Sequence, residues 1–484
     1  MRKFLATVFV CFLACLQSSF GNSGAGHDRF PSSTAIPRTF FGMHINRTST
    51  PWPDVPFGSL RMLGNLTTWF HIEGDARNRY DWRMLDAWLE AARAHNADMM
   101  YTFSRTPAWA ARNAHSTCGP SRDEADCSPP ADLNASAPCQ GPLRGTTTTD
   151  CYFKEFATSL LDHVCSGKAP NKSCRIVAFS CWNEPNLDGF WIGTYAESAK
   201  MCSDMVQIVK AQCESCVTLT PDISAATSGD TKDNGDSRSY DEWFRNFLVA
   251  YRPYGNYPDA TAVHLYAART HGIVPAPFPE TFAGSGCPHE DRSPVCPDTL
   301  LGKIDTMRTI MNQDGMAGKP VWTTEGGWGT NGEMRDLDAQ AAYVARWLIL
   351  QASAGVERAY WYMWDMGSDP QAWGGLWDQQ HGTYKAGIAY GQVYWWLVGA
   401  RFMRPCSADH SVWTCDLVRG DGRQERIVWN DSRSYETGVT WKYAAGSPFI
   451  QVRDLDGHEA PISGGMVSIG SKPVLLESAE SPRK

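Results

Sequence analysis

Short apolar segments alternate with longer amphipathic segments along most of the chain. The apolar segments are rich in β-branched and aromatic residues, which is typical of buried strands. This pattern predicts strands over residues 39–45, 59–63, 98–103, 176–179, 217–220, 262–266, 321–325 and 358–363. Apolar residues at helical spacing predict helices over residues 84–95, 152–165, 195–213, 240–251, 299–312, 337–353 and 391–398.

The regular alternation of strand and helix favours a parallel sheet. Eight such units, with polar residues at the carboxyl ends of the strands, predict an α/β fold of the (β/α)8 TIM barrel type over residues 39–400. The pattern leaves two long connections, residues 107–150 and 268–297, which are rich in Pro and Cys. Their length is unusual, so we expect disulfides to hold them.

The last part of the chain has a different pattern, with short strands separated by turn residues. We expect strands over residues 413–418, 425–429, 438–441, 449–452 and 467–469. Gly420-Asp-Gly422 and Asp456-Gly457 are typical of hairpin turns. The pattern predicts a small antiparallel β-domain over residues 401–484. It contains no cluster of acids or histidines, which favours a supporting role over a sugar-binding module.

The N-terminus has the features of a secretory signal peptide, assigned to residues 1–26. Arg2 and Lys3 precede an apolar run over residues 4–16 that is too short to span a bilayer. A lipoprotein anchor at Cys15 is the less favoured alternative, because the three residues before it make a poor lipid-attachment box. We therefore expect a secreted protein, extracellular or periplasmic, and no transmembrane segment.

The number of cysteines indicates that the protein folds in an oxidising compartment. Of the 16 cysteines, two lie in the signal, and the rest form an even, high count. Short spacings suggest the pairs Cys118–Cys127, Cys139–Cys151, Cys165–Cys174, Cys287–Cys296 and Cys406–Cys415, and leave Cys181, Cys202, Cys213 and Cys216 unassigned. Cys213-x-x-Cys216 is half of a zinc pattern, but no second CxxC or His pair lies nearby.

Composition narrows the possible partners. The chain is 43% hydrophobic and 20% charged, which is ordinary for a globular protein. A net charge of -8 and the absence of a Lys/Arg-rich block argue against a nucleic-acid partner. The 20 tryptophans suit stacking on sugar faces, although many will be core residues. Five N-glycosylation sequons begin at Asn46, Asn65, Asn134, Asn171 and Asn430.

The fourth predicted strand ends in a carboxylate, Glu184, between Trp182-Asn183 and Pro185. Burying an unpaired carboxylate is costly, so this position suggests either a functional acid or a structural acid with a basic partner. Glu325 ends the seventh strand in the same way. A barrel brings strand ends together, and two facing carboxylates are what glycoside hydrolysis requires. Arg61 would keep one of them ionised, and an apolar wall of Trp would favour the protonated form of the other.

The residues around both glutamates resemble motifs of clan A glycoside hydrolases, with family 39 and its near relatives most alike. Trp182-Asn-Glu-Pro-Asn186 with Gly189-Phe-Trp191 resembles the clan's fourth-strand motif. Thr324-Glu-Gly-Gly-Trp328 resembles its seventh-strand nucleophile motif, and Thr106-Pro-Ala-Trp109 a loop of family 39. The resemblance covers roughly residues 40–477, because that family also carries a small C-terminal β-domain.

The resemblance implies a retaining mechanism with Glu325 as nucleophile and Glu184 as acid/base. Asn183 would bind the sugar 2-hydroxyl, Tyr266 would orient Glu325, and His264 and Arg61 would support it. Trp364 would form the floor of the sugar subsite, while Trp191 and Trp328 are candidates for either stacking or packing. No metal or cofactor is required, and the substrate would be a poly- or oligosaccharide. Alternatively, His264 is a core histidine and Arg61 a structural ion-pair partner.

Three other functions compete with hydrolysis. A non-catalytic carbohydrate-binding protein on the same barrel is disfavoured, because a degenerate copy usually loses one glutamate. A transglycosylase would use the same covalent intermediate. Gly327-Trp-Gly-Thr-Asn-Gly332 matches a dinucleotide-binding pattern, but the acid expected about 20 residues further on would fall inside a helix.

Overall fold

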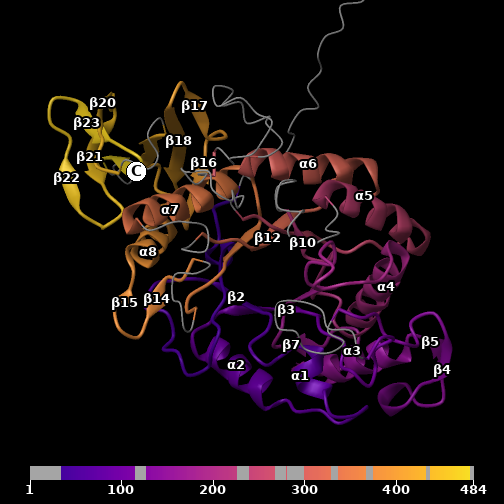
Figure 1. The fold of residues 1–484 in the computed structure, drawn as a ribbon. Helices are drawn as coiled ribbons and strands as arrows, with labels where there is room; N and C mark the ends of the chain where they lie inside the picture. The colour runs from indigo at the N-terminus through magenta and orange to yellow at the C-terminus, as the bar shows by residue number, and fades with distance from the viewer. Residues whose placement is uncertain are drawn as a thin grey trace, which may run out of the picture.

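The computed structural model describes residues 34–114, 127–225, 239–266, 279–280, 299–328, 336–366, 374–431 and 437–479. The assigned signal peptide lies outside these residues. Within them, the predicted (β/α)8 barrel with a C-terminal antiparallel β-domain is confirmed (Figure 1). No helix in these ranges is long and apolar enough to cross a bilayer.

The barrel is a parallel sheet of nine short strands in the order β10-β11-β12-β13-β1-β2-β3-β8-β9. Their bounds are β1 Phe41–Met43, β2 Ser59–Met62, β3 Asp98–Thr102, β8 Ala178–Ser180, β9 Val217–Leu219, β10 Ile223–Ser224, β11 Thr261–His264, β12 Val321–Glu325 and β13 Arg358–Trp361. Every one lies at a predicted strand except β10, which follows the predicted fifth strand.

The fifth barrel position is divided between β9 and β10. β9 pairs with β8, and β10 pairs with β11. Isolated parallel bridges, Asn183 with Asp222 and Leu219 with Ala260, continue the pairing across this break. The two consecutive pieces therefore close the barrel, and the eight predicted positions are retained.

The helices pack around this sheet (Figure 1). Their bounds are α1 Trp69–Glu73, α2 Arg83–Ala94, α3 Cys151–Val164, α4 Tyr195–Gln212, α5 Tyr240–Tyr251, α6 Leu300–Gln313, α7 Leu337–Ser353 and α8 Lys385–Leu397, with 3-10 turns η1 Arg38–Phe40, η2 Gly141–Leu143 and η4 Arg252–Tyr254. Seven match predicted helices. α8 begins before the predicted residue 391, because Gly387 and Gly391 lie inside it and obscure its pattern. The short α1 was not predicted.

Three small hairpins decorate the barrel: β4 Ser136–Pro138 with β5 Thr147–Thr149, β6 Cys165–Ser166 with β7 Ser173–Cys174, and β14 Trp377–Asp378 with β15 Gly382–Thr383. The predicted disulfides Cys139–Cys151, Cys165–Cys174 and Cys406–Cys415 are confirmed. The predicted Cys118–Cys127 and Cys287–Cys296 involve cysteines outside the described residues.

The four unassigned cysteines form two further disulfides, Cys181–Cys202 and Cys213–Cys216. The alternative of a zinc site at Cys213-x-x-Cys216 is wrong for this structure, because the two sulfur atoms are bonded to each other in a disulfide. Cys181–Cys202 joins the end of β8 to α4 and so fixes the backbone just before Glu184.

The β-domain has a main antiparallel sheet of order β16-β18-β19-β24-β21-β22, with β17 on β18, and a separate β20–β23 pair. Bounds are β16 Ala400–Phe402, β17 Ser407–Asp409, β18 Val412–Arg419, β19 Gln424–Asn430, β20 Trp441–Ala444, β21 Phe449–Arg453, β22 Glu459–Pro461, β23 Met466–Ile469 and β24 Val474–Ser478. Both predicted hairpin turns are confirmed. The strand expected over residues 438–441 begins at Trp441, and four short strands were missed.

Buried polar contacts join the β-domain to the barrel. Arg346 of α7 is fully buried and donates to the carbonyl of Ser471. Trp429 Nε1 donates to Glu280 in a barrel connection at 2.8 Å. Arg419 donates to the carbonyl of Trp396 at the end of α8, at 2.7 Å. The two parts are therefore fixed against each other.

Candidate active site

The backbone at Glu184 is held in an unusual conformation. Its φ is 41°, in the left-handed region that costs a non-glycine residue about 1 kcal/mol or more. The Glu184 amide donates to the Asp222 carbonyl at 2.7 Å. Asn186 exchanges two hydrogen bonds with the Ser224 backbone, at 2.9 and 3.0 Å. These contacts tie the turn after β8 to β10 and fix the direction of the Glu184 side chain.

Glu325 is the last residue of β12, and both of its carboxylate oxygens accept hydrogen bonds. Arg61 Nη1 donates to Oε1 at 2.5 Å, and the Tyr266 hydroxyl donates to Oε2 at 2.9 Å. The next residue, Gly326, must lack a side chain, because a Cβ there would lie 2.3 Å from Trp347. Packing and two donors therefore fix the position of Glu325.

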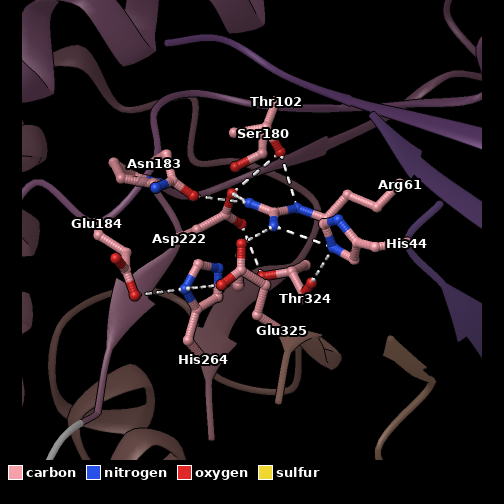
Figure 2. Close-up of polar contacts among 12 residues, drawn as sticks. His44, Arg61, Thr102, Ser180, Asn183, Glu184, Asp222, His264, Thr324 and Glu325 are labelled. Carbon is pink, nitrogen blue, oxygen red and sulfur yellow. Dashed lines mark hydrogen bonds and ion pairs between the residues drawn. The ribbon is translucent and has the colours of Figure 1, made fainter. Parts of the chain in front are cut away.

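His264 lies between the two glutamates (Figure 2). Its Nδ1 is 2.8 Å from Glu184 Oε1 and 3.3 Å from Glu325 Oε2. Burial lowers the pKa of His264, but the charges of Glu325 and Glu184 outweigh burial and raise it above the ordinary value. Oxygens of both glutamates and a ring nitrogen of His264 all lie within 4.8 Å of one another. The imidazole thus contacts both acids, whereas the sequence suggested support for Glu325 alone.

Arg61 connects the centre of the site (Figure 2). It is fully buried and, besides Glu325, donates to Thr102 Oγ1 at 3.0 Å, Asn183 Oδ1 at 2.9 Å and Asp222 Oδ2 at 2.5 Å. Burial opposes its charge, but Asp222 and Glu325 outweigh that effect and raise the pKa of Arg61. Because Asn183 Oδ1 is engaged, its amide nitrogen, which has no partner among the described residues, stays available to a ligand.

Sequence reasoning missed two ionisable members of this network, Asp222 and His44. Asp222 also accepts a hydrogen bond from Thr324 Oγ1 at 2.8 Å, so it joins Arg61 to the seventh strand. His44 Nε2 lies 3.3 Å from Arg61 Nη1. Burial, followed by the Arg61 charge, lowers the pKa of His44 well below its ordinary value, so the ring is neutral. The available signal was position: His44 directly follows β1, and Asp222 lies between β9 and β10 at the fifth barrel position.

The three candidate tryptophans are buried. Trp191 is 1% exposed and packs against Trp182, with ring centroids 5.4 Å apart. Trp328 packs against Tyr343 at 4.7 Å. Trp364 is 1% exposed and stacks on Trp377 at 6.5 Å. The packing alternative therefore describes the observed contacts of Trp191 and Trp328. A direct contact of any of the three with sugar, including the predicted floor at Trp364, stays a prediction.

The donor set at the two glutamates could in principle hold a cation, since Glu184, His264 and Glu325 are grouped closely enough. However, both Glu325 oxygens already accept from Arg61 and Tyr266. The fixed guanidinium supplies the positive charge that a cation would bring. The arrangement is suited to proton transfer and nucleophilic attack by carboxylates.

Comparison with known proteins gives a likeness in fold. No protein-family model and no curated protein matches the chain. A family 39 glycoside hydrolase from Bacteroides cellulosilyticus WH2 is similar with TM-score 0.62 and 16% identity, covering 92% of this chain and 81% of that one. A monomeric β-xylosidase from Caulobacter crescentus CB15 is similar with TM-score 0.57 and 16% identity, covering 92% and 96%.

A family 44 xyloglucanase from Paenibacillus polymyxa has TM-score 0.55 and 13% identity, covering 92% of this chain and 97% of that one. All three belong to clan A of the glycoside hydrolases. The predicted resemblance to this clan, with family 39 most alike, is therefore confirmed for the fold. At these identities the likeness defines the architecture, and the chemistry must be argued from the site itself.

Proposed function

We propose that this protein is a secreted retaining glycoside hydrolase that cleaves O-glycosidic bonds of a poly- or oligosaccharide. One observation carries the proposal: oxygens of Glu184 and Glu325 lie within 4.8 Å of each other at the carboxyl ends of barrel strands. Retaining enzymes need about 5–5.5 Å between the two carboxyl groups, whereas inverting enzymes need about 6.5–9.5 Å to admit a water.

The different partners of the two acids support a division of roles. Glu325 accepts from a guanidinium and a phenol, which suits a carboxylate nucleophile. Glu184 contacts His264, whose pKa is raised by both glutamates, so the Glu184–His264 pair can hold one proton. Asn183 presents its amide nitrogen to the sugar 2-hydroxyl.

In the first step a Glu325 oxygen attacks the anomeric carbon. The bond to the leaving oxygen breaks as that oxygen takes the proton of the Glu184–His264 pair. In the second step the pair removes a proton from water, and the water oxygen attacks the anomeric carbon. The Glu325 ester bond then breaks, which returns the carboxylate and leaves the sugar with its original configuration.

Secretion rests on the N-terminal signal pattern and on the disulfides. The substrate is sought first among aryl β-xylosides, aryl β-glucosides, xylan and xyloglucan, because similar structures include a β-xylosidase and a xyloglucanase.

Azide rescue tests both roles. We expect Glu325→Ala and Glu184→Ala to lose activity by about 10³-fold or more. Azide should restore turnover of an aryl glycoside in both, with an inverted glycosyl azide from Glu325→Ala and a retained one from Glu184→Ala. The matched control is Glu357→Ala, an exposed glutamate just before β13 at the other end of the barrel, which should keep full activity.

Unchanged activity in both alanine variants would overturn the assignment. Glycan binding without turnover in the wild type would favour the non-catalytic binding protein instead.

A further inference from the structure

A cavity of about 300 Å³ lies between α8 and the β-domain. Gln392 and Trp395 of α8 line one side, and Arg423, Arg453 and Glu477 of the β-domain line the other. Barrel helices run antiparallel to the strands, so the end of α8 lies at the amino ends of the strands. The cavity is therefore at the opposite end of the barrel from the two glutamates.

Trp395 is the most exposed large apolar side chain in the described part of the chain, at 62%. Its neighbour Trp396 is 1% exposed and packs in the core. A single exposed apolar residue is ordinary, but this indole lines a cavity whose other lining residues, apart from Trp396 and Leu475, are polar or charged. Leaving an indole face in water forgoes the apolar burial that a flat ligand would provide.

The arginines of the cavity are paired with carboxylates, of which Glu477 itself lines the cavity. Arg423 Nη1 donates to Glu477 Oε1 at 3.2 Å, and Arg453 Nη2 donates to Glu477 Oε2 at 3.3 Å. Arg419 pairs with Glu425 at 2.8 Å. An anion would have to compete with these carboxylates for the guanidinium groups. A neutral ligand with hydroxyl groups can accept from the arginines and donate to Glu477 without breaking the pairs.

Gln392 supplies an uncommitted polar group. Among the described residues, none makes a hydrogen bond with its side-chain amide, although the residue lines the cavity. An amide offers two donors and one acceptor, which matches adjacent hydroxyl groups.

We infer that this cavity is a second carbohydrate-binding site that holds one neutral sugar unit of a glycan chain. The apolar face of the sugar stacks on Trp395, and its hydroxyl groups bind Gln392 and the arginine–glutamate pairs. Its volume is at the lower end of the range for ligand pockets, about 300–1,000 Å³, so the rest of the chain stays outside. The choice of carbohydrate as ligand rests on the proposed function. Because the site is remote from Glu184 and Glu325, it anchors the protein on a polymer without entering the reaction.

Affinity gel electrophoresis tests the site, with xylan, xyloglucan, mixed-linkage β-glucan or polygalacturonate in the gel. All proteins carry Glu325→Ala so that the polymer stays intact. We expect at least one neutral polysaccharide to retard the parent. Adding Trp395→Ala should weaken that retardation about tenfold or more, and Trp395→Phe should restore part of it. Tyr254→Ala, at an aromatic residue 40% exposed outside the cavity, should behave as the parent.

Separate measurements distinguish this site from the catalytic one. With Glu325 intact, Trp395→Ala should keep the kcat/KM of the wild type on a soluble aryl glycoside and its melting temperature. No retardation by any neutral polysaccharide, retardation that Trp395→Ala leaves unchanged, or loss confined to polygalacturonate would overturn the inference. A wild type that binds polysaccharide through Trp395 but hydrolyses nothing would refute the proposed function and leave the binding site standing.

Discussion

Asp222 is the residue through which the barrel holds Arg61 in place. The carboxylate accepts from Arg61, from Thr102 at 3.1 Å and from Thr324, and both it and Arg61 are fully buried. A buried guanidinium that loses one of two carboxylates keeps its desolvation cost without the compensating attraction. The position of Arg61, and through it that of Glu325, therefore depends on a residue that has no direct part in the proposed reaction.

Asp222→Asn is expected to lower the free energy of unfolding by about 3 kcal/mol, because it leaves half of a buried ion pair uncompensated. It should also lower kcat/KM by about 10²-fold, since a small displacement of Glu325 is enough to misalign attack. Urea unfolding and steady-state kinetics measure the two effects.

Asp259→Asn is the matched control for this substitution. Asp259 pairs with Lys210 at 2.7 Å, but the two side chains are 39% and 28% exposed. A solvent-exposed pair contributes about 1 kcal/mol or less, so activity should be unchanged. Equal losses in the two variants would contradict the positioning role of Asp222.

The protonation of His264 determines how we expect activity to depend on pH. Its pKa is raised above 6.5 by Glu325 and Glu184, so the Glu184–His264 pair keeps its proton into the neutral range. The protonated pair is the active form, and activity should fall as pH rises through the pKa of the pair. His264→Phe removes the imidazole whose pKa is raised, so we expect the basic limb of the kcat/KM profile to move to lower pH.

His44→Phe provides the comparison, because the pKa of His44 is lowered and this ring is already neutral. The basic limb of the kcat/KM profile of His44→Phe should stay at the wild-type pH even if kcat/KM itself is lower. A shift of the same size in both variants would assign the limb to another group.

The sequence predicted the residues of the site whose chemistry is unusual for a strand end. Glu184 and Glu325 were found because buried carboxylates at strand ends are costly, and Arg61, Asn183 and Tyr266 lie in the same network. Asp222 escaped notice because an aspartate after a short strand is also a common turn residue. Its partner Arg61 lies on a strand 161 residues away, a distance that no local pattern spans.

At the scale of elements, the disulfide Cys181–Cys202 joins the strand of Glu184 to α4. The link closes a loop with sequence separation 21, and Glu184 follows three residues after Cys181. The constraint therefore acts on the turn that holds Glu184 in its left-handed conformation.

Replacing both cysteines by serine is expected to lower the free energy of unfolding by about 3 kcal/mol on the loop-entropy account. It should also lower activity, because the turn before Glu184 loses its covalent support. The Cys213–Cys216 disulfide closes a loop of separation 3, so for its double serine variant the same account gives about half that loss, and we expect unchanged activity. The unfolding midpoints and kcat values of the two double variants measure these effects. Equal activity in the two variants would exclude a role for Cys181–Cys202 at the site.

Helices and strands were predictable where the spacing of apolar residues and the length of the segment indicated the same kind of element. All eight barrel positions and seven helices follow that rule, because each buries one apolar face against the next layer. The β4–β5 hairpin was missed because its strands, Ser136–Pro138 and Thr147–Thr149, carry no alternating apolar residues and are held by Cys139–Cys151 instead. The break between β9 and β10 was invisible because the chain runs on through Pro221 and Asp222 to complete one barrel position.

At the scale of the whole molecule, the barrel and the β-domain share buried polar partners. Arg346 of α7 is fully buried, and its guanidinium donates to the Ser471 carbonyl of the β-domain and pairs with Glu280 of the barrel at 3.6 Å. The carbonyls at the end of α8 depend on Arg419. The sequence pattern changes between residues 39–400 and residues 401–484. That each of these predicted ranges is a folding unit stays a prediction.

Deletion of residues 401–484 is expected to yield no soluble folded barrel, because it removes the Ser471 acceptor of the buried Arg346 and exposes the apolar face under the sheet. The intact protein should unfold in one calorimetric transition. Arg419→Ala, which removes only the contacts to α8, should lower the melting temperature and keep a single transition. A soluble, active barrel over residues 39–400, or two separate transitions, would contradict this coupling.

The enclosure of Arg61 between Asp222 and Glu325 has a further consequence for the solutions in which the protein can work. Dissolved ions screen charges that face water, over about 8–10 Å at ordinary ionic strength, but they do not enter a site whose charged groups are buried. The surface pairs, such as Arg83 with Asp81, weaken as salt is added. The charges around Glu325 do not, so turnover of a neutral substrate should be nearly independent of ionic strength up to the salt concentration at which the fold itself fails.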